Sequence, residues 1–123
     1  MKGRVENSGA VIPVTFHLET GQLLQIEFVV DTGFTGALAL PLQAVRHLRL
    51  PFEQEVTADL PDSSVISVPV HFADIEWNDA RKRVRVLGMG RTPRIGMALL
   101  ANCRFGAEFW EGGAVIIAPK GKS

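Results

Sequence analysis

The arrangement that limits the fold of this chain most is a pair of alternating stretches that run into one short turn around Asp31. From Ile12 to Leu18 every second side chain is apolar, and the same period returns in the next stretch through Leu24, Ile26, Phe28 and Val30. A period of two is typical of a strand with one buried face. Gly33 and Gly36 follow Asp31 closely and favour a compact turn. We therefore expect two paired strands, the second of which carries a carboxylate into a glycine-bracketed turn.

The rest of the sequence is divided into short elements by proline, glycine and polar turns. Pro41 precedes a helical pattern in which Leu42, Val45 and Leu48 share one face. Further strands or apolar runs are predicted at 37–40, 53–60, 65–72, 75–77, 81–87, 103–110 and 114–118, with helices at 42–48 and 97–102 and a frayed tail at 119–123. Many short strands, two brief helices and 12 glycines predict an all-β fold with a small closed architecture.

Length, charge and cysteine content narrow the class of protein. The 123 residues suffice for a single domain, 1–123, and are too few for two. Basic and acidic side chains balance at 13 each, which argues against an electrostatic nucleic-acid binder. Cys103 is the only cysteine, so we expect no intrachain disulfide, no cysteine-based metal cluster and a reducing compartment. The sequence has neither a signal-peptide core nor a run of about 20 apolar residues, and predicts a soluble, cytoplasmic protein that does not bind membranes.

Asp31, Thr32 and Gly33 form the motif with the most specific chemistry. Aspartic peptidases hydrolyse amides with two carboxylates that share one proton and hold a water molecule between them. This sequence has one Asp-Thr-Gly, so the second carboxylate has to come from a second copy. The Thr32 hydroxyl can fix the loop by a hydrogen bond, and Gly33 permits backbone torsions and close substrate approach. The tripeptide also occurs in ordinary β-turns, but the apolar runs on both sides favour the catalytic interpretation.

On these residues the chain resembles the retropepsin-like aspartic proteases, and more closely the small prokaryotic members with Asp-Thr-Gly-Phe-Thr-Gly followed by Leu-x-Leu-Pro. Here these motifs are Asp31 to Gly36 and Leu38 to Pro41, and the resemblance extends from Val11 to Ile117. It implies an all-β, single-domain barrel of the retropepsin type. It also implies an aspartic endopeptidase that is active as a homodimer on a peptide or protein substrate, with one Asp31 from each subunit and with neither cofactor nor metal ion.

The same resemblance assigns roles to residues near the motif. Thr32 would tie the two loops together across the dimer axis, and Gly33 would lie against the substrate backbone. Ile95 and Gly96 match a strand residue and a glycine that pack beneath the catalytic loop. Phe34 and the apolar residues near Gly96 favour hydrophobic substrate side chains.

The predicted hairpin from Glu53 to Phe72 matches the flap that closes over substrate in this family. Its tip would contact substrate through Leu60, Pro61, Asp62, Ser63 and Ser64. Viral flaps have a glycine-rich run at this point, whereas Pro61 and Asp62 make this tip stiffer and more acidic. We therefore expect substrate access and substrate choice to differ from those of the viral enzymes.

Three departures from the viral pattern lie near the loop. The arginine that follows the second glycine in viral members is Met97 here, and the aspartate with which it pairs is Thr35. Both partners are absent together, so the dimer interface has to differ. Arg94 also stands where an apolar residue is usual. With the altered flap, these departures leave open an alternative function, namely a binding or interaction module of the same fold without peptidase activity.

The remaining polar and aromatic features give weaker signals. The three histidines are far apart in the sequence and predict ordinary histidines instead of a metal site. The basic run Arg81–Arg85 has no interleaved aromatic residue and is most simply a solvated strand edge that opposes aggregation. Trp77 and Trp110 are expected to be core or interface anchors.

Overall fold

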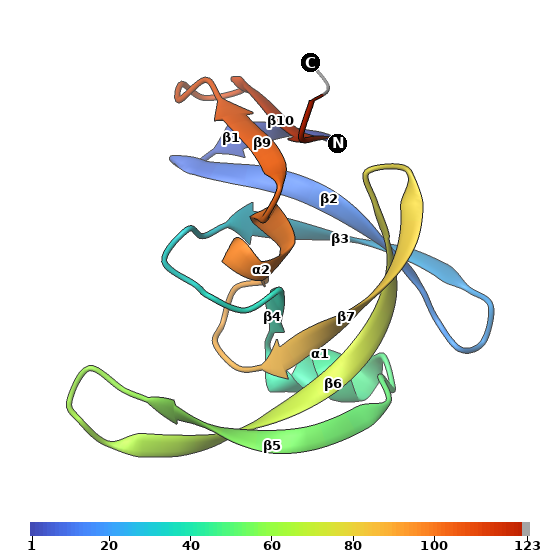
Figure 1. Cartoon of the computed structure of the whole chain (residues 1–123), viewed down its shortest axis with the longest axis vertical. Coiled ribbons are helices and arrows are strands. Elements are labelled where there is room, and N and C mark those ends of the chain that lie inside the picture. Colours follow the sequence, from blue (N-terminus) through green and yellow to red (C-terminus); the bar gives the residue numbers. More distant parts are fainter. Residues whose placement is uncertain (122–123) are drawn as a thin grey trace.

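The computed structural model describes residues 1–121, which form ten strands and two short helices (Figure 1). In chain order these are β1 (Lys2–Glu6), β2 (Gly9–His17), β3 (Leu23–Val30), β4 (Leu38–Leu40), α1 (Leu42–His47), β5 (Phe52–Asp59), β6 (Val65–Trp77), β7 (Ala80–Gly88), β8 (Arg94–Ile95), α2 (Met97–Leu100), β9 (Cys103–Ala107) and β10 (Ala114–Pro119). The all-β class with two brief helices is confirmed. Neither helix in this part of the chain is long and apolar enough to cross a bilayer.

The strands form one sheet that partly closes on itself. Their order is β5-β6-β7-β4-β8-β3-β2-β1-β10-β9, and β6 also pairs with β2. This additional pairing makes a ring of β6, β7, β4, β8, β3 and β2. The other strands extend beyond the ring, with β5 attached to β6 and the series β1, β10, β9 attached to β2. The closed architecture expected from the sequence is therefore a ring of paired strands with extensions on two sides.

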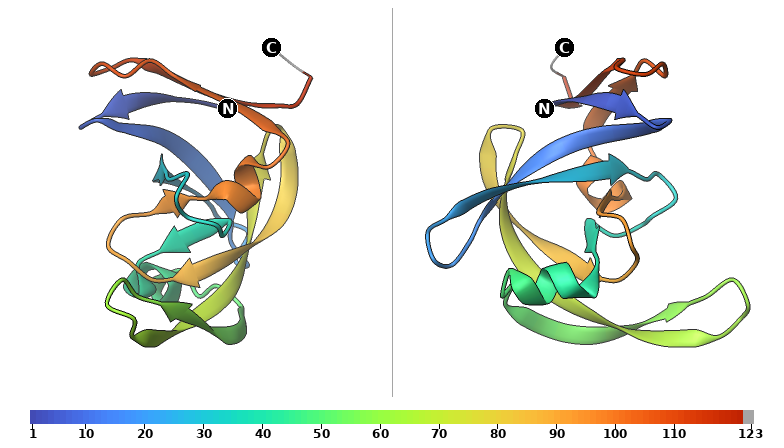
Figure 2. Two further views of the ribbon diagram at one scale, coloured as in Figure 1. Left: turned by 60° about the vertical axis from the view of Figure 1, so that its left-hand side comes forward. Right: turned by 180° about the vertical axis from the view of Figure 1, so that it is seen from behind.

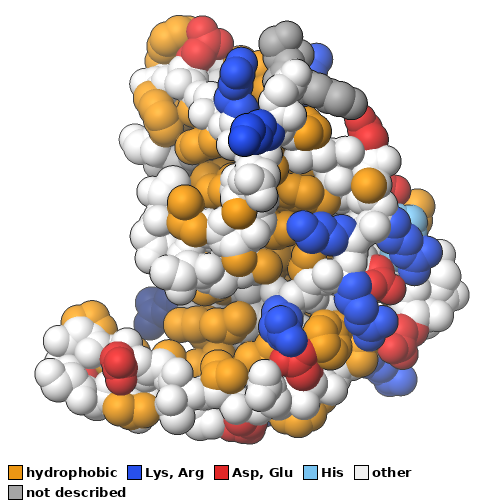
Figure 3. Space-filling view, viewed as in Figure 1, with side chains coloured by type: hydrophobic (Ala, Val, Ile, Leu, Met, Phe, Trp, Pro, Cys, Tyr) orange, Lys and Arg blue, Asp and Glu red, His pale blue; other side chains and the backbone are white. Residues whose placement is uncertain are grey.

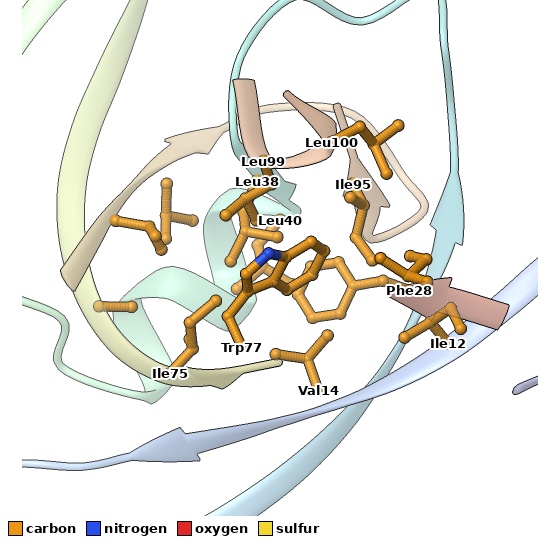
Figure 4. Packing of buried hydrophobic residues seen from close by; sticks show 14 of the residues in the cluster. Ile12, Val14, Phe28, Leu38, Leu40, Ile75, Trp77, Ile95, Leu99 and Leu100 are labelled. Carbon is orange, nitrogen blue, oxygen red and sulfur yellow. The ribbon is translucent and has the colours of Figure 1, made fainter. Parts of the chain in front are cut away.

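The alternation predicted for β2 and β3 becomes the inner face of the ring. The two strands are antiparallel, with Ile12 opposite Phe28 and Val14 opposite Ile26. Phe16 and Phe28 are fully buried and stack with their ring centroids 5.9 Å apart. Figure 4 shows this face meeting apolar side chains from three other parts of the chain, among them Leu38, Leu40, Ile75, Trp77, Ile95 and Leu99. Removal of this apolar surface from water is the main force that holds the ring closed.

One strand, β6, belongs both to the ring and to a projecting hairpin. It is continuous over 13 residues, whereas the sequence indicated separate strands at 65–72 and 75–77. Its second half pairs with β7 from Val70 to Trp77, and among the described strands its first half pairs only with β5. Residues 54–69, which we call the arm, consequently project from the body as a two-stranded hairpin (Figures 1 and 2).

The basic run Arg81–Arg85 lies in β7 as predicted. Only the last part of β7, Val86–Gly88, pairs with β4. Among the described strands, the basic run is therefore bordered by β6 alone. Arg85 donates through Nε to Glu53 at 2.8 Å, a contact that links β5 at the base of the arm to the body. The expectation of a solvated strand edge is confirmed, because the arginine side chains in this run are exposed.

The two ends of the chain differ from the sequence-based expectation. β1 has no clear alternation, and it forms because β2 and β10 flank it on both sides. Lys120, in the tail that we expected to be frayed, donates its N–H to the Asn102 carbonyl at 2.8 Å, and the tail's last two residues lie outside the described range.

The strand predicted at 103–110 is shorter than expected. β9 ends at Ala107, and the chain then turns through residues 108–113, where the Gly113 N–H donates to the Trp110 carbonyl at 2.7 Å. Trp110 is 63% exposed, so a place in the core is wrong for this residue. Trp77, at 6% exposure, is a core residue as predicted.

Candidate active site

Asp31 follows β3 directly, at a point where this strand runs parallel to β8. Val29 is paired with Arg94, and Val30 is paired with Ile95. Backbone bonding continues past the end of β3, because the Asp31 N–H donates to the Ile95 carbonyl at 2.8 Å. The backbone of Asp31 is therefore held by a hydrogen bond to β8, a strand of the ring.

Both carboxylate oxygens of Asp31 have a donor in this protomer. Oδ1 accepts the Gly33 N–H at 2.9 Å, and Oδ2 lies 2.9 Å from Nη1 of Arg94. The Asp31 side chain is 30% exposed and that of Arg94 is 52% exposed. An ion pair this open to solvent contributes only about 1 kcal/mol or less to folding. Its main consequence is therefore chemical, because it places a fixed positive charge against the candidate carboxylate.

Gly33 lies close to the candidate carboxylate and does not adopt a left-handed backbone torsion. Its φ lies outside the left-handed range in which Gly21 and Gly90 are found, so the unusual torsion expected at this glycine is not present. A Cβ at Gly33 would stand 3.3 Å from Oδ1 of Asp31 and crowd the carboxylate. Thr32 is exposed, and its hydroxyl has no hydrogen-bond partner among residues 1–121. Within one protomer the loop therefore holds its shape without that hydroxyl.

The start of α2 supports the loop formed by residues 31–36, which we call the Asp31 loop. Three successive backbone N–H groups donate to carbonyl oxygens of the loop or of the residue after it. The Met97 N–H donates to the Phe34 carbonyl at 2.8 Å and the Ala98 N–H to the Gly36 carbonyl at 3.2 Å. The Gly96 N–H donates to the carbonyl of Ala37, just after the loop, at 2.9 Å. Ile95 is fully buried beneath these contacts. The structure thus places Ile95 and Gly96 under the Asp31 loop.

The Phe34 ring packs against two glycines, Gly36 and Gly96. Its side chain is half-buried, and its ring lies so close to Gly36 that a Cβ there would stand 2.6 Å from Cζ. The ring also covers Gly96, where a Cβ would overlap both the ring and the Gly36 carbonyl oxygen. Part of the Phe34 ring is therefore used for packing within the loop, and the remainder is open to solvent.

The five predicted tip residues lie at the end of the arm, where Pro61 to Ser64 are exposed and Leu60 is half-buried. The Leu60 N–H donates to the Ser64 carbonyl at 2.8 Å, and Ser63 has a left-handed φ of 70°. Asp62 Oδ1 accepts hydrogen bonds from the hydroxyl of Ser64 and from its N–H at 3.0 Å. Both contacts hold the pKa of Asp62 below its usual value, and the hydrogen bond from the hydroxyl has the larger effect. The tip is therefore organised by its own polar groups.

The tip and the Asp31 loop lie on the same side of the molecule without touching. Both project to the left in Figure 1 and to the right in the reverse view of Figure 2. Among the described residues no hydrogen bond or ion pair joins 60–64 to 31–36. Between the arm and the body there is a recess with apolar side chains along it (Figure 3).

Within residues 1–121 no group of three or more His, Cys, Asp or Glu side chains is arranged to hold a metal ion.

The contact between Arg94 and Asp31 was not expected from the sequence. A signal was present, because an arginine directly before the buried Ile95 has to point to the opposite face of β8. Directly paired residues of neighbouring strands share a face, and faces alternate along a strand. Arg94 is paired with Val29, and Asp31 lies two residues after Val29, so both charged side chains lie on one face. Only the β3–β8 register, however, makes that inference available.

The ring of strands, the loop with one aspartate and the projecting hairpin together define a fold of the retropepsin type. Among solved structures, this fold is similar to the crystal structure of a retropepsin-like aspartic protease from Rickettsia conorii, with a TM-score of 0.56 and 15% sequence identity. The alignment covers 96% of this chain and 91% of that chain. The retropepsin-type fold expected from the sequence is thereby confirmed. No protein-family model matches the sequence, and no curated protein matches it.

Proposed function

We propose that this protein is an aspartic endopeptidase that acts as a homodimer on peptide or protein substrates, with one Asp31 from each subunit. The observation that carries this proposal is the Asp31 loop itself. It follows a strand of a retropepsin-type fold, is bonded to Ile95 at its start and rests on Gly96 at its end. A carboxylate held in this way keeps one position, as preorganised catalysis requires.

The chemistry needs two such loops related by a twofold axis. Two carboxylates about 3 Å apart cannot both stay charged, so the pair retains one proton. The charged member then takes a proton from a water molecule that attacks the amide carbon, and the protonated member donates to the carbonyl oxygen. The small Gly33 leaves room for the substrate backbone, and the Thr32 hydroxyl, unused within the protomer, is available to the partner loop.

Asp31→Asn tests the activity, because it keeps the size of the side chain and removes its charge. We expect the parent protein to cleave members of a diverse peptide library and the variant to be slower by about three orders of magnitude or more. Circular dichroism and sedimentation should show that the variant keeps its fold and assembly. Equal activity of parent and variant, or full activity of a parent that stays monomeric at high micromolar concentration, would contradict the proposal.

The Arg94–Asp31 contact favours a second candidate, a peptide-binding module of the same fold that does not cleave. In this protomer both oxygens of Asp31 already accept hydrogen bonds, one of them from a cation. A module of this kind would bind members of the same library while neither the parent nor the Asp31→Asn variant released any product. Turnover by the parent that depends on Asp31 would exclude this candidate.

A further inference from the structure

The guanidinium of Arg94 has hydrogen-bonding capacity that the protomer does not use. Nη1 donates to Asp31, and Asp31 is the only carboxylate within 4.0 Å of Arg94 among residues 1–121. A guanidinium carries five N–H donors in a planar fork that matches the two oxygens of a carboxylate. With 52% of its side chain exposed, Arg94 offers the remaining donors to a molecule that enters the site.

The distance between Arg94 and Asp31 determines which part of a substrate these donors reach. A carboxylate bound on the far side of the guanidinium would lie about 5–7 Å from Oδ2 of Asp31, given hydrogen bonds of about 3 Å on each side. Consecutive Cα atoms are about 3.8 Å apart, so the side chain of a residue next to the cleaved amide can span this distance. Arg94 is therefore placed to contact a side chain that flanks the scissile bond.

The charges of the assembled site favour an acidic side chain at that position. A pair of Asp31 carboxylates that shares one proton carries one negative charge. Two copies of Arg94, one on each side of the twofold axis, contribute two positive charges. The four groups thus leave one positive charge in excess, which a substrate carboxylate neutralises and which a lysine or arginine of the substrate increases.

We propose that Arg94 is a specificity-determining residue that selects peptides with aspartate or glutamate beside the scissile bond. The inference rests on the proposed function, because it takes Asp31 as the group that activates the attacking water molecule. In the absence of substrate, Arg94 binds Asp31. When substrate is present, its free N–H groups bind the acidic side chain while the contact with Asp31 orients the guanidinium. Because Arg94 is present once per subunit, the preference applies on both sides of the cleaved bond.

Matched peptides that differ only by Glu or Gln at the residues flanking the cleaved bond measure this preference directly. For the parent we expect kcat/KM to be at least about tenfold higher for the Glu peptide, as for a charge-assisted hydrogen bond. Arg94→Gln should abolish the difference, and Arg94→Glu should reverse it towards peptides with Lys. Arg91→Gln is the control, because Arg91 is exposed three residues earlier and has no ion-pair partner within residues 1–121. That control variant should retain the Glu preference.

A binding measurement separates this inference from the proposed function. Asp31→Asn protein is used to select peptides from a randomised library, with the Asp31→Asn/Arg94→Gln double variant as the comparison. Enrichment of Asp and Glu that disappears in the double variant supports the role of Arg94 even if the parent cleaves nothing. Equal selection by both proteins, or cleavage by the parent with no acidic preference, overturns it. An equal change in kcat for every peptide in Arg94→Gln would also overturn it, since Arg94 would then act only on Asp31.

Discussion

Gly96 determines whether the Asp31 loop can rest on the ring of strands. Its backbone is extended, with φ of −110°, so any residue could adopt these torsions. The constraint is space, because a Cβ would overlap the Gly36 carbonyl oxygen and stand 2.6 Å from that of Phe34. These are backbone atoms in hydrogen-bonded positions, and they cannot move aside as the end of a flexible side chain can.

Gly96→Ala is therefore expected to lower the free energy of unfolding by at least about 2 kcal/mol, as overpacking against backbone does. Urea unfolding at a fixed protein concentration measures the change. Gly106→Ala is the matched control, because no atom lies within 4 Å of a Cβ at that position in β9. Its stability should be unchanged or higher by up to about 1 kcal/mol. Equal stabilities of the two variants would contradict the packing argument.

The arm combines a rigid base with a tip that is organised locally. At the base, Val70 pairs with Leu87 and Arg85 binds Glu53, so β5 and β6 are tied to the body. Beyond Val70 the two strands have only each other as partners among the described strands. The tip depends on Asp62, which accepts two hydrogen bonds from Ser64. Because these bonds favour the charged carboxylate, they persist into acidic solution.

The pH dependence of the tip follows from the sign of this shift. The pKa of Asp62 is lower in the folded chain than in the unfolded chain, so its contribution is complete above about pH 4 and is lost as the pH falls through the lower folded value. The chemical shift of the Ser64 amide proton, followed by NMR from pH 6 to pH 2, should report this loss. Ser64→Ala should raise the midpoint because the stronger donor is removed, and Asp62→Asn should abolish the transition. A parent midpoint at or above that of an ordinary aspartate would contradict the assignment.

The pairing of the chain ends bears on how two copies would meet. Within one chain β1 pairs with both β2 and β10, and the Met1 ammonium group donates to the Ile117 carbonyl at 2.6 Å. The backbone groups on both edges of β1 are thus used within the protomer. A twofold contact that joins two Asp31 loops would form on the side where the loop and the arm project (Figure 1).

Mixing parent protein with Asp31→Asn protein tests whether the active unit contains two Asp31 residues. With nine parts of the variant to one part of the parent, activity per parent chain should fall about tenfold after subunit exchange, because most parent chains then pair with an inactive partner. Dilution of the parent should also lower the specific activity as dimers dissociate. Activity that is independent of both treatments would show that one chain acts alone. The same mixture with Gly106→Ala, whose loop is intact, should lose no activity.

Several parts of this fold and site can be predicted because their signals are local. The alternation in 12–18 and 23–30 predicts β2 and β3, and the turn residues at 61–64 predict the tip of the arm. The helix at 42–48 is recognisable from one apolar face. The signals fail where an element depends on its neighbours. β1 has little pattern of its own, and the interval between 72 and 75 that we read as a break lies inside β6.

The sequence by itself determined that a single carboxylate follows a strand with one apolar face, in a turn that contains two glycines, within an all-β chain. These properties depend on side-chain period and turn chemistry, which act over a few residues. The tertiary structure alone decided what surrounds that carboxylate. Arg94 lies 63 positions from Asp31, and the two meet only because β3 and β8 pair in parallel with a particular register. Contacts of this range depend on how strands pair across the whole ring, and no local pattern encodes that pairing.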